Sequence, residues 1–236
     1  MTTKHDHQAP WRAEFTKPPV AGSAGRSGGA SRGASPGASP GASPGALASE
    51  SASESASESA AEISERWRAE AAAVKPYIDP GVGVPESDQW LDKPGIALLQ
   101  AMLGGLAPPA PMALALDYQL LHVQPGRAIY QGQPSARFNN PMGSVHGGWF
   151  ATLLDSALGC AVHTALPAGQ GYTTLELKLN LIRALSEKVG LVRAEGRLVH
   201  LGGQTATAEA RLVGPDGKLY AHGSTTCLVF PYRKAG

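Results

Sequence analysis

The stretch from 139 to 155 contains residue types whose spacing could support catalysis. A turn containing Pro and Gly leads into His146-Gly147-Gly148, and an apolar run with a single acid, Asp155, follows. Two adjacent glycines remove Cβ bulk where a substrate must approach the backbone. The first N–H groups of a helix lack intrahelical partners and lie at the positive end of its dipole, so they favour a negatively charged oxygen. Thioester hydrolysis, which passes through an oxyanion, needs such a place.

The expected helix also constrains how the acid can be used. His146 and Asp155 are nine residues apart, which corresponds to about 900° of rotation and roughly 13 Å along the axis. Asp155 therefore cannot serve the start of its own helix. If Asp155 and the Gly147 amide act on one carbonyl, they must come from different chains, paired by a two-fold axis that brings antiparallel helices together. This geometry predicts two identical composite sites per dimer.

This stretch resembles the PaaI-like (phenylacetyl-CoA-type) acyl-CoA thioesterases of the hotdog-fold superfamily. The family pattern is Asn-Pro-x-Gly-x-x-His-Gly-Gly, then an Ala/Thr/Leu run and Asp, and it is matched here by Asn140, Pro141, Gly143, His146, Gly147, Gly148 and Asp155. The likeness continues through 171–180, 194–197 and 220–222 and covers roughly residues 95 to 231. It implies an acyl-CoA substrate and a homo-oligomer, a dimer or a dimer of dimers, with sites across the subunit interface.

The resemblance also implies roles for individual residues. The Gly147 amide, with Gly148 beside it, would hold the thioester oxygen. Asp155 of the partner subunit would act either as a base on water or as a nucleophile on the carbonyl, and the sequence does not separate these two roles. Thr174 corresponds to the family's Ser/Thr beside the acid and would orient the water.

Further matched positions are expected to shape the site. Asn140 and His146 would form the turn and hydrogen-bond near the thioester, with His146 an orienting group rather than a base. Arg183 follows the central strand where many relatives have Arg-Pro; it would either meet a coenzyme A phosphate or be an ordinary strand-end charge. Trp149 replaces a smaller aliphatic residue and would narrow the acyl pocket. Aryl or short-to-medium acyl groups are therefore the expected substrates.

Each candidate also has a purely structural interpretation. Asp155 would be a solvated residue on a polar helix stripe, and the two glycines would only permit close packing. Thr174 would be a β-forming residue. Asn140 would be a turn or N-cap residue, and His146 a structural hydrogen-bonding group. The resemblance favours the functional interpretation of the whole set.

Composition excludes several function classes. The formal net charge is +1, so no basic field indicates a nucleic-acid partner. No signal-peptide core or membrane-spanning run is present, so we expect no membrane partner and a cytoplasmic protein. The two cysteines, Cys160 and Cys227, lie in apolar runs without metal-ligand spacing, which favours buried free thiols. Neither a nucleophile elbow nor a phosphate loop is found, and we expect no metal or cofactor.

Low-complexity sequence dominates the N-terminal part. Residues 22–46 are nearly all Gly, Ala, Ser and Pro, and a Ser/Ala/Glu repeat follows at 49–62. Such segments bury too little apolar surface to offset chain entropy. Trp67 is interpreted as part of a solvated spacer, with partner docking as the alternative. The sequence predicts a largely disordered extension over 1–89 and a hotdog thioesterase domain over 90–236.

The pattern of that domain predicts an α+β fold. A single helix among antiparallel strands is buried only if the sheet curls around it, which is the hotdog arrangement. From Thr174 the leucines 175, 177, 179 and 181 alternate with polar residues and should face the core. The elements expected are a helix over 95–103, a hairpin of 114–123 and 128–133, one long central helix after His146, and strands over 172–182, 189–200, 204–213 and 218–230.

Two functions of different classes remain. The first is an acyl-CoA thioesterase that releases a free acid and coenzyme A. The second is a non-catalytic acyl-CoA-binding hotdog module tethered through its N-terminal tail. A catalyst should lose turnover with Asp155→Asn while still binding acyl-CoA, whereas a binding module has no hydrolysis to lose.

Overall fold

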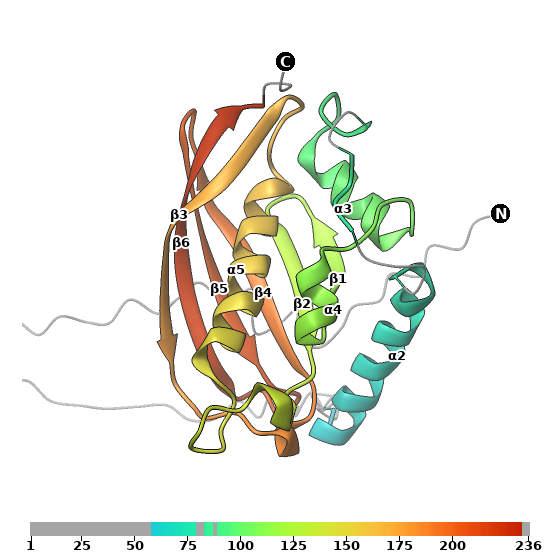
Figure 1. The fold of residues 1–236 in the computed structure, drawn as a ribbon, viewed down its shortest axis with the longest axis vertical. Helices are drawn as coiled ribbons and strands as arrows, with labels where there is room; N and C mark the ends of the chain where they lie inside the picture. Colours follow the sequence, from blue (N-terminus) through green and yellow to red (C-terminus); the bar gives the residue numbers. More distant parts are fainter. Residues whose placement is uncertain (1–57, 79–82, 87–88, 233–236) are drawn as a thin grey trace, which may run out of the picture. The chain divides into compact units, whose positions relative to one another are not determined.

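The structure is a computed structural model that describes residues 58–78, 83–86 and 89–232. The expected tether over 22–46 and most of the repeat over 49–62 lie outside these residues. Within the described part, the elements follow in the order α2 (Ala60–Ile78), α3 (Gly95–Leu103), α4 (Pro111–Leu116), β1 (Tyr118–Gln124), β2 (Arg127–Gly132), η2 (Ala136–Phe138), α5 (Gly147–His163), β3 (Gln170–Leu181), η3 (Glu187–Val189), β4 (Val192–Leu201), β5 (Thr205–Val213) and β6 (Leu219–Pro231) (Figure 1).

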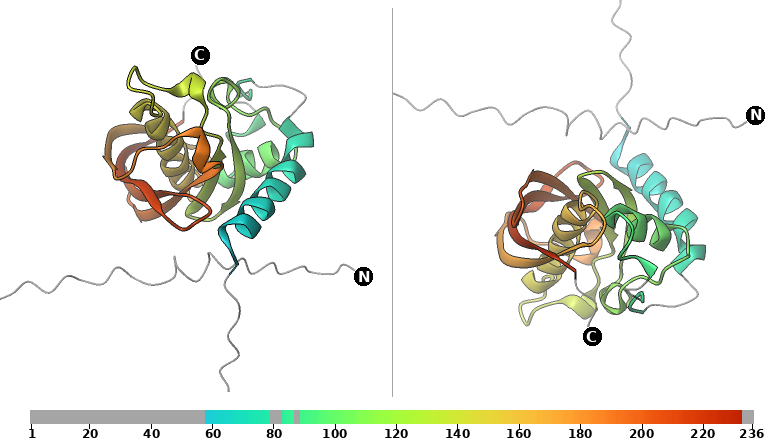
Figure 2. Two further views of the ribbon diagram at one scale, coloured as in Figure 1. Left: turned by 90° about the horizontal axis from the view of Figure 1, so that it is seen from below. Right: turned by 90° about the horizontal axis from the view of Figure 1, so that it is seen from above.

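The six strands form one antiparallel sheet in the order β1-β2-β4-β5-β6-β3. The sheet curls around α5, as the end-on views show (Figure 2). The predicted α+β hotdog arrangement is therefore confirmed. The predicted short helix and the four strands after α5 are also confirmed as α3 and β3 to β6, with ends that differ by at most three residues.

α5 is buried because apolar residues recur on the face that it turns to the sheet. Leu153, Leu154 and Leu158 are fully buried in this core, and burial of each such side chain is worth about 1.5–3 kcal/mol. The helix backbone lies directly on β4, since a Cβ at Gly196 would collide with the carbonyl of Ala157. This close approach explains why glycine is needed at position 196.

The first strand of the predicted hairpin begins later than expected. Residues 114–116 belong to α4, which starts with Pro111 at its first turn and ends at Asp117 in the left-handed conformation, φ 54°. Proline is preorganised for a helix start, and the left-handed residue redirects the chain into β1. The prediction of strand over 114–117 was wrong for this reason.

The strict alternation predicted for β3 is only partly correct. Leu177 and Leu179 pack against the core, but Leu175 and Leu181 are 60% and 52% exposed. A register shift between Thr174 and Glu176 makes Leu175 an extra, bulged residue. The two faces of the strand therefore exchange at this point.

α2 forms part of the folded unit, Ser59–Gly236, although residues 59–89 were assigned to the extension. Trp67 is 3% exposed, and the guanidinium of Arg193 lies 4.4 Å from its ring centroid. Arg193 also pairs with Glu70 at 2.7 Å, and Gln131 donates to the Trp67 carbonyl at 3.4 Å. The expectation that Trp67 belongs to a solvated spacer was therefore wrong.

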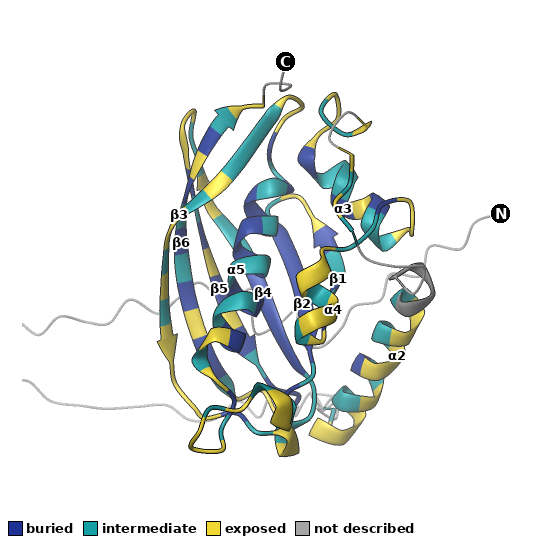
Figure 3. Cartoon of the chain, in the orientation of Figure 1, coloured by how far each residue is buried: buried dark blue, intermediate teal, exposed yellow. Residues whose placement is uncertain are grey.

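The contacts of α2 place it on the sheet face opposite α5. Gly132 and Gly196 face α5, since a Cβ on either would strike that helix. Gln131 is adjacent to Gly132 and Arg193 is three residues from Gly196, so both lie on the other face, where they are hydrogen-bonded to each other at 2.9 Å. This double cover explains why β2 is buried along its whole length (Figure 3).

Candidate active site

The turn before α5 is built around the side chain of Asn140. Its Oδ1 accepts the N–H groups of Met142 at 2.9 Å and Ser144 at 3.3 Å, and its Nδ2 donates to the Ser144 hydroxyl at 3.0 Å. Gly143 adopts φ 83°, a conformation that glycine reaches without strain. The predicted turn-shaping role of Asn140 agrees with these bonds, whereas its contact with a thioester stays a prediction.

The first turn of α5 presents one free donor. His146 is the N-cap, and its Nδ1 accepts the N–H of Gly148 at 2.9 Å, while Trp149 N–H donates to the His146 carbonyl at 3.0 Å. Among the described residues the N–H of Gly147 has no acceptor. Gly147 is therefore the expected oxyanion donor, and the Gly148 amide is already engaged.

Asp155 and Thr174 are brought together as the sequence predicted. The Thr174 hydroxyl donates to Asp155 Oδ1 at 3.2 Å, from the edge strand β3 to the middle of α5. Asp155 is half-buried, so it is not a freely solvated residue of a polar stripe. On the neighbouring position, Ser156 donates to the Tyr118 hydroxyl at 3.2 Å. Sequence reasoning missed Tyr118 and Ser156, because nothing in their local pattern links β1 to the acid.

The other ionisable groups around Asp155 are held neutral. Burial raises the pKa of Cys160 to about 11, against an opposing hydrogen bond with Tyr130, and the charge of Asp155 adds to the rise. Burial also raises the pKa values of Cys227 and Tyr172. Both cysteines are free, as predicted. Protonated thiols are poor nucleophiles, so neither cysteine competes with Asp155 as the candidate catalytic group.

Within one chain, the expected oxyanion donor Gly147 and the acid Asp155 lie far apart. α5 is a continuous helix, and the eight residues from Gly147 to Asp155 correspond to about 12 Å along its axis. Thr174 lies with Asp155 at the middle of the helix. Leu181, at the other end of β3, lies over Gly147 instead, since a Cβ at Gly147 would be 3.1 Å from its Cδ1.

Arg183 is exposed just beyond β3, at the Gly147 end of α5. Its N–H donates to the Tyr220 carbonyl at 3.1 Å, and its charge is close enough to lower the pKa of Lys218 slightly, against a larger rise caused by Asp216. The structure therefore places Arg183 near a second cation and not beside Asp155.

Trp149 does not narrow a substrate pocket, contrary to the expectation. It is 3% exposed and points toward the sheet, where its Nε1 donates to the Leu116 carbonyl at 2.9 Å and its ring stacks on Phe138 at 5.9 Å. Gly132 leaves the room for this indole, since a Cβ there would lie 2.8 Å from it. Trp149 is thus a core residue.

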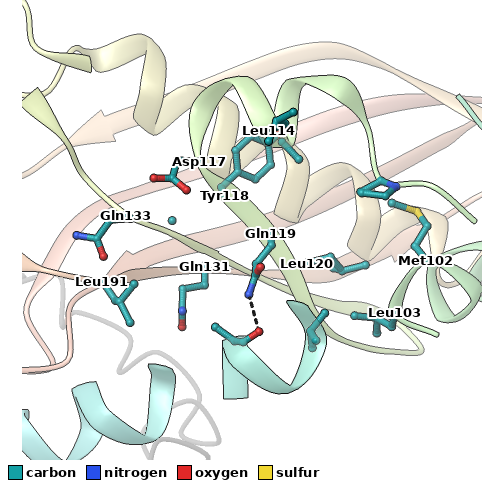
Figure 4. A pocket seen from close by; sticks show the side chains of 15 residues that line it. Met102, Leu103, Leu114, Asp117, Tyr118, Gln119, Leu120, Gln131, Gln133 and Leu191 are labelled. Carbon is teal, nitrogen blue, oxygen red and sulfur yellow. Dashed lines mark hydrogen bonds between the residues drawn. The ribbon is translucent and has the colours of Figure 1, made fainter. Parts of the chain in front are cut away.

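A cavity of about 340 Å³ lies between α2, α3, α4 and the β1–β2 hairpin (Figure 4). Met102, Leu103 and Leu114 form apolar walls, and Gln119 donates to the Ala71 carbonyl at 3.2 Å across it. None of the candidate catalytic residues lines this cavity. Tyr118 lines it and accepts a hydrogen bond from Ser156 of α5, the residue that follows Asp155.

Two further properties concern the described residues alone. They contain no cluster of three or more His, Cys, Asp or Glu side chains placed to bind a metal ion. No helix among them is both long enough and apolar enough to cross a membrane.

Comparison with protein families gives a match over residues 142–221 to the model described as the thioesterase superfamily. A Pseudomonas aeruginosa protein provisionally named an esterase is 34% identical over 97 residues, which cover 41% of this chain and 66% of that protein. The 1,4-dihydroxy-2-naphthoyl-CoA hydrolase of Listeria monocytogenes is 25% identical over 119 residues, 50% of this chain and 95% of the hydrolase.

Two solved structures show the same fold. A phenylacetic acid degradation-related protein of Ralstonia eutropha is 30% identical, with a TM-score of 0.51, and the match covers 56% of this chain and 98% of that protein. The Escherichia coli PaaI protein, from the phenylacetic acid degradation operon, is 20% identical with a TM-score of 0.51, over 59% of this chain and 96% of PaaI. The second likeness concerns the fold alone.

Proposed function

Because the chain belongs to the hotdog-fold thioesterase superfamily and is a thioester hydrolase, we propose that it hydrolyses acyl-CoA thioesters at a site shared between two subunits. The observation that carries this proposal is the unengaged N–H of Gly147 at the start of the helix that holds Asp155. A thioester oxygen would be the hydrogen-bond acceptor for this N–H. The products are a carboxylic acid and coenzyme A.

The proposed chemistry uses Asp155 and Thr174 of one subunit and Gly147 of the other. Because the Thr174 hydroxyl donates its hydrogen to Asp155 Oδ1, its oxygen is available to accept one hydrogen of a water molecule, and Asp155 Oδ2 is available to accept the other. Water attacks the carbonyl carbon as its proton passes to Asp155, and the oxyanion accepts from Gly147 N–H. The oxyanion then collapses, the C–S bond breaks, and coenzyme A leaves as a thiolate, which takes up the proton that Asp155 accepted from water and so restores the Asp155 carboxylate. In the alternative, the Asp155 carboxylate attacks the thioester carbonyl directly and forms an anhydride, which water then hydrolyses. This route also uses Asp155, Thr174 and the Gly147 N–H.

His146 supports this site as an orienting group. With its Nδ1 accepting from Gly148, the ring fixes the helix start and leaves Gly147 as the exposed donor. The absence of a Cβ at Gly148 leaves room for the His146 ring, since a Cβ there would lie 3.1 Å from His146 Nδ1. We place coenzyme A phosphate at Arg183, which lies at this end of α5 and whose guanidinium fork suits phosphate.

A homodimer is part of the proposal, because one chain separates the donor from the acid. β3 is an edge strand, and an open strand edge is a template for pairing with another chain. Exposed apolar side chains lie near the start of α5, with Met142 87%, Leu181 52% and Ile182 49% exposed. A second copy of the chain would cover such a surface. Dimers of this dimer remain compatible with the proposal.

For the acyl group we propose an aryl or short-to-medium chain. The support comes from the relatives, one of which is named for an aryl-CoA substrate. The burial of Trp149 removes the sequence argument for a narrowed pocket, so the preference rests on the relatives alone.

The test is release of free thiol from phenylacetyl-, benzoyl-, hexanoyl- and palmitoyl-CoA by the wild-type chain and by Asp155→Asn. We expect turnover of the aryl and hexanoyl substrates and loss of turnover, with retained acyl-CoA binding, in the variant. A folded wild-type protein that binds but hydrolyses none of them would instead be a non-catalytic acyl-CoA-binding module.

Subunit mixing tests whether the site is shared. Gly147→Pro and Asp155→Asn each inactivate both sites of their own dimers. A mixed dimer holds one intact site, formed by Gly147 of the Asp155→Asn chain and Asp155 of the Gly147→Pro chain. Because half of randomly mixed dimers are heterodimers, about a quarter of the wild-type rate should return. A site contained within one chain would give no recovery.

A further inference from the structure

The bulge in β3 lies directly beside the proposed catalytic acid. Thr174 pairs with Cys227 across the sheet, and Glu176 pairs with the adjacent Thr226, so Leu175 has no partner of its own. Bulges re-aim the side chains of the strand that contains them and often lie next to active sites.

The alternation of side chains along β3 identifies Thr174 as the one that the bulge redirects. Leu177 and Leu179 face the core, so in a regular strand Leu175 would share their face and Thr174 would point away from α5. Instead Leu175 is exposed, and the Thr174 hydroxyl reaches Asp155 at 3.2 Å. The extra residue thus lets one strand present both its leucines to the core and Thr174 to the acid.

One buried side chain on the neighbouring strand holds the bulge. Thr225 of β6 is 2% exposed, and its hydroxyl donates to the carbonyl of Glu176 at 2.7 Å. Glu176 is the residue that directly follows the extra one. A buried hydroxyl is costly unless it is hydrogen-bonded, so this bond both satisfies Thr225 and fixes the backbone at the bulge.

We propose that Thr225 is a positioning residue for thioester hydrolysis: its bond to the Glu176 carbonyl holds the bulge that turns the Thr174 hydroxyl to Asp155. This inference rests on the proposed function, because Thr225 acts only through Thr174. It assigns a catalytic consequence to a buried residue on a different strand from Thr174.

Thr225→Val tests the proposal, because it removes the hydroxyl and keeps the branched shape. A misplacement of catalytic groups by about 1 Å can cost about 10²-fold in rate, so we expect kcat to fall by about 10- to 10²-fold with KM little changed. Thr225→Ser retains the hydroxyl and should restore kcat. The matched control is Thr226→Val on the same strand, whose hydroxyl lies 3.4 Å from the Glu176 carboxylate, not from its carbonyl; it should keep the wild-type kcat.

The decisive measurement is a double-mutant cycle with Thr174→Val. If Thr225 acts through Thr174, the double variant is no slower than Thr174→Val alone. Multiplied losses in the double variant, or an unchanged kcat in Thr225→Val, would overturn the proposal. Should Thr225→Val not fold, Thr225→Ala takes its place in the same cycle.

Asp155→Asn, assayed in parallel, distinguishes failure of the proposed hydrolysis from failure of the positioning role of Thr225. An active Asp155→Asn enzyme refutes the proposed function and, with it, the role of Thr225. An inactive Asp155→Asn enzyme together with a fully active Thr225→Val enzyme refutes the positioning role alone.

Discussion

Replacing Gly147 by proline should remove the oxyanion donor without breaking the helix. Gly147 is the first residue of α5, where proline is favoured and its missing N–H costs no intrahelical bond. The preceding residue, His146, has φ −62° and ψ 139°, which is the region that a following proline requires. Because the Gly147 N–H has no acceptor among the described residues, no hydrogen bond of the folded chain is lost.

The magnitude follows from the function of that single donor. Removal of one oxyanion-hole donor typically lowers kcat by about 10²- to 10³-fold, or roughly 2.7–4 kcal/mol. Gly147→Ala is the matched control: it adds a Cβ at 3.1 Å from Leu181 Cδ1, the end of a flexible side chain, but keeps the N–H. It should retain most of the activity.

The assay is kcat and KM for thiol release, with the melting temperature of each variant as the check on folding. Since the donor acts mainly on the charged transition state, kcat should fall while KM changes little. Equal kcat values for Gly147→Pro and Gly147→Ala, in two equally stable proteins, would refute the assignment of the Gly147 amide.

Two further predictions concern stability. Trp67→Ala should lower the free energy of unfolding in urea by about 3–5 kcal/mol, because the indole is buried between α2 and the sheet; a change below about 0.5 kcal/mol, typical of surface sites, would contradict the docking of α2. Burial lowers the pKa of His163 below its ordinary 6.5, so the unfolded chain takes up this proton first and stability should fall as the pH drops from about 6.5 toward the native pKa. His163→Gln should flatten that part of the pH dependence, measured by urea unfolding between pH 7.5 and 5; an unchanged slope would show that His163 is not its source.

The helix that holds the site could be predicted because its signals are local. His146 caps α5, and the apolar periodicity that follows buries one face of the helix. Asn140 and Gly143 are likewise explained by the turn that they form. The motif residues form the turn and the helix start themselves, so the local structure around the candidate site could be predicted from them.

The bulge in β3 could not be read from the same kind of pattern. The leucines at 175, 177, 179 and 181 alternate perfectly in the sequence, and nothing local marks Leu175 as the extra residue. Its position depends on pairing with β6 and on the Thr225 hydroxyl, some fifty residues away. Strand alternation predicts faces only where the ladder is regular.

α2 was missed for two different reasons. Its start carries a recognisable capping box, since Ser59 N–H donates to the Glu62 carboxylate at 2.8 Å and Glu62 N–H to the Ser59 hydroxyl at 3.3 Å. This capping box lies at the end of the Ser/Ala/Glu repeat over 49–62, and the whole repeat was predicted to be disordered. The burial of Trp67, by contrast, depends on Gln131 and Arg193, which no local pattern connects to it.

The geometry of α5 also determines where the proposed two-fold axis must pass. For Gly147 of one helix to lie opposite Asp155 of an antiparallel copy, the crossing point must be midway between them, at Ala151. Packed helices lie about 8–10 Å apart, and small side chains at the contact favour the shorter distance. The residues at this crossing, Gly148, Ala151 and Thr152, are small, and the Thr152 hydroxyl already donates to the Gly148 carbonyl at 3.0 Å. On this face of α5 the side chains between Gly147 and Asp155 are therefore small, which favours the close crossing that the proposed shared site needs.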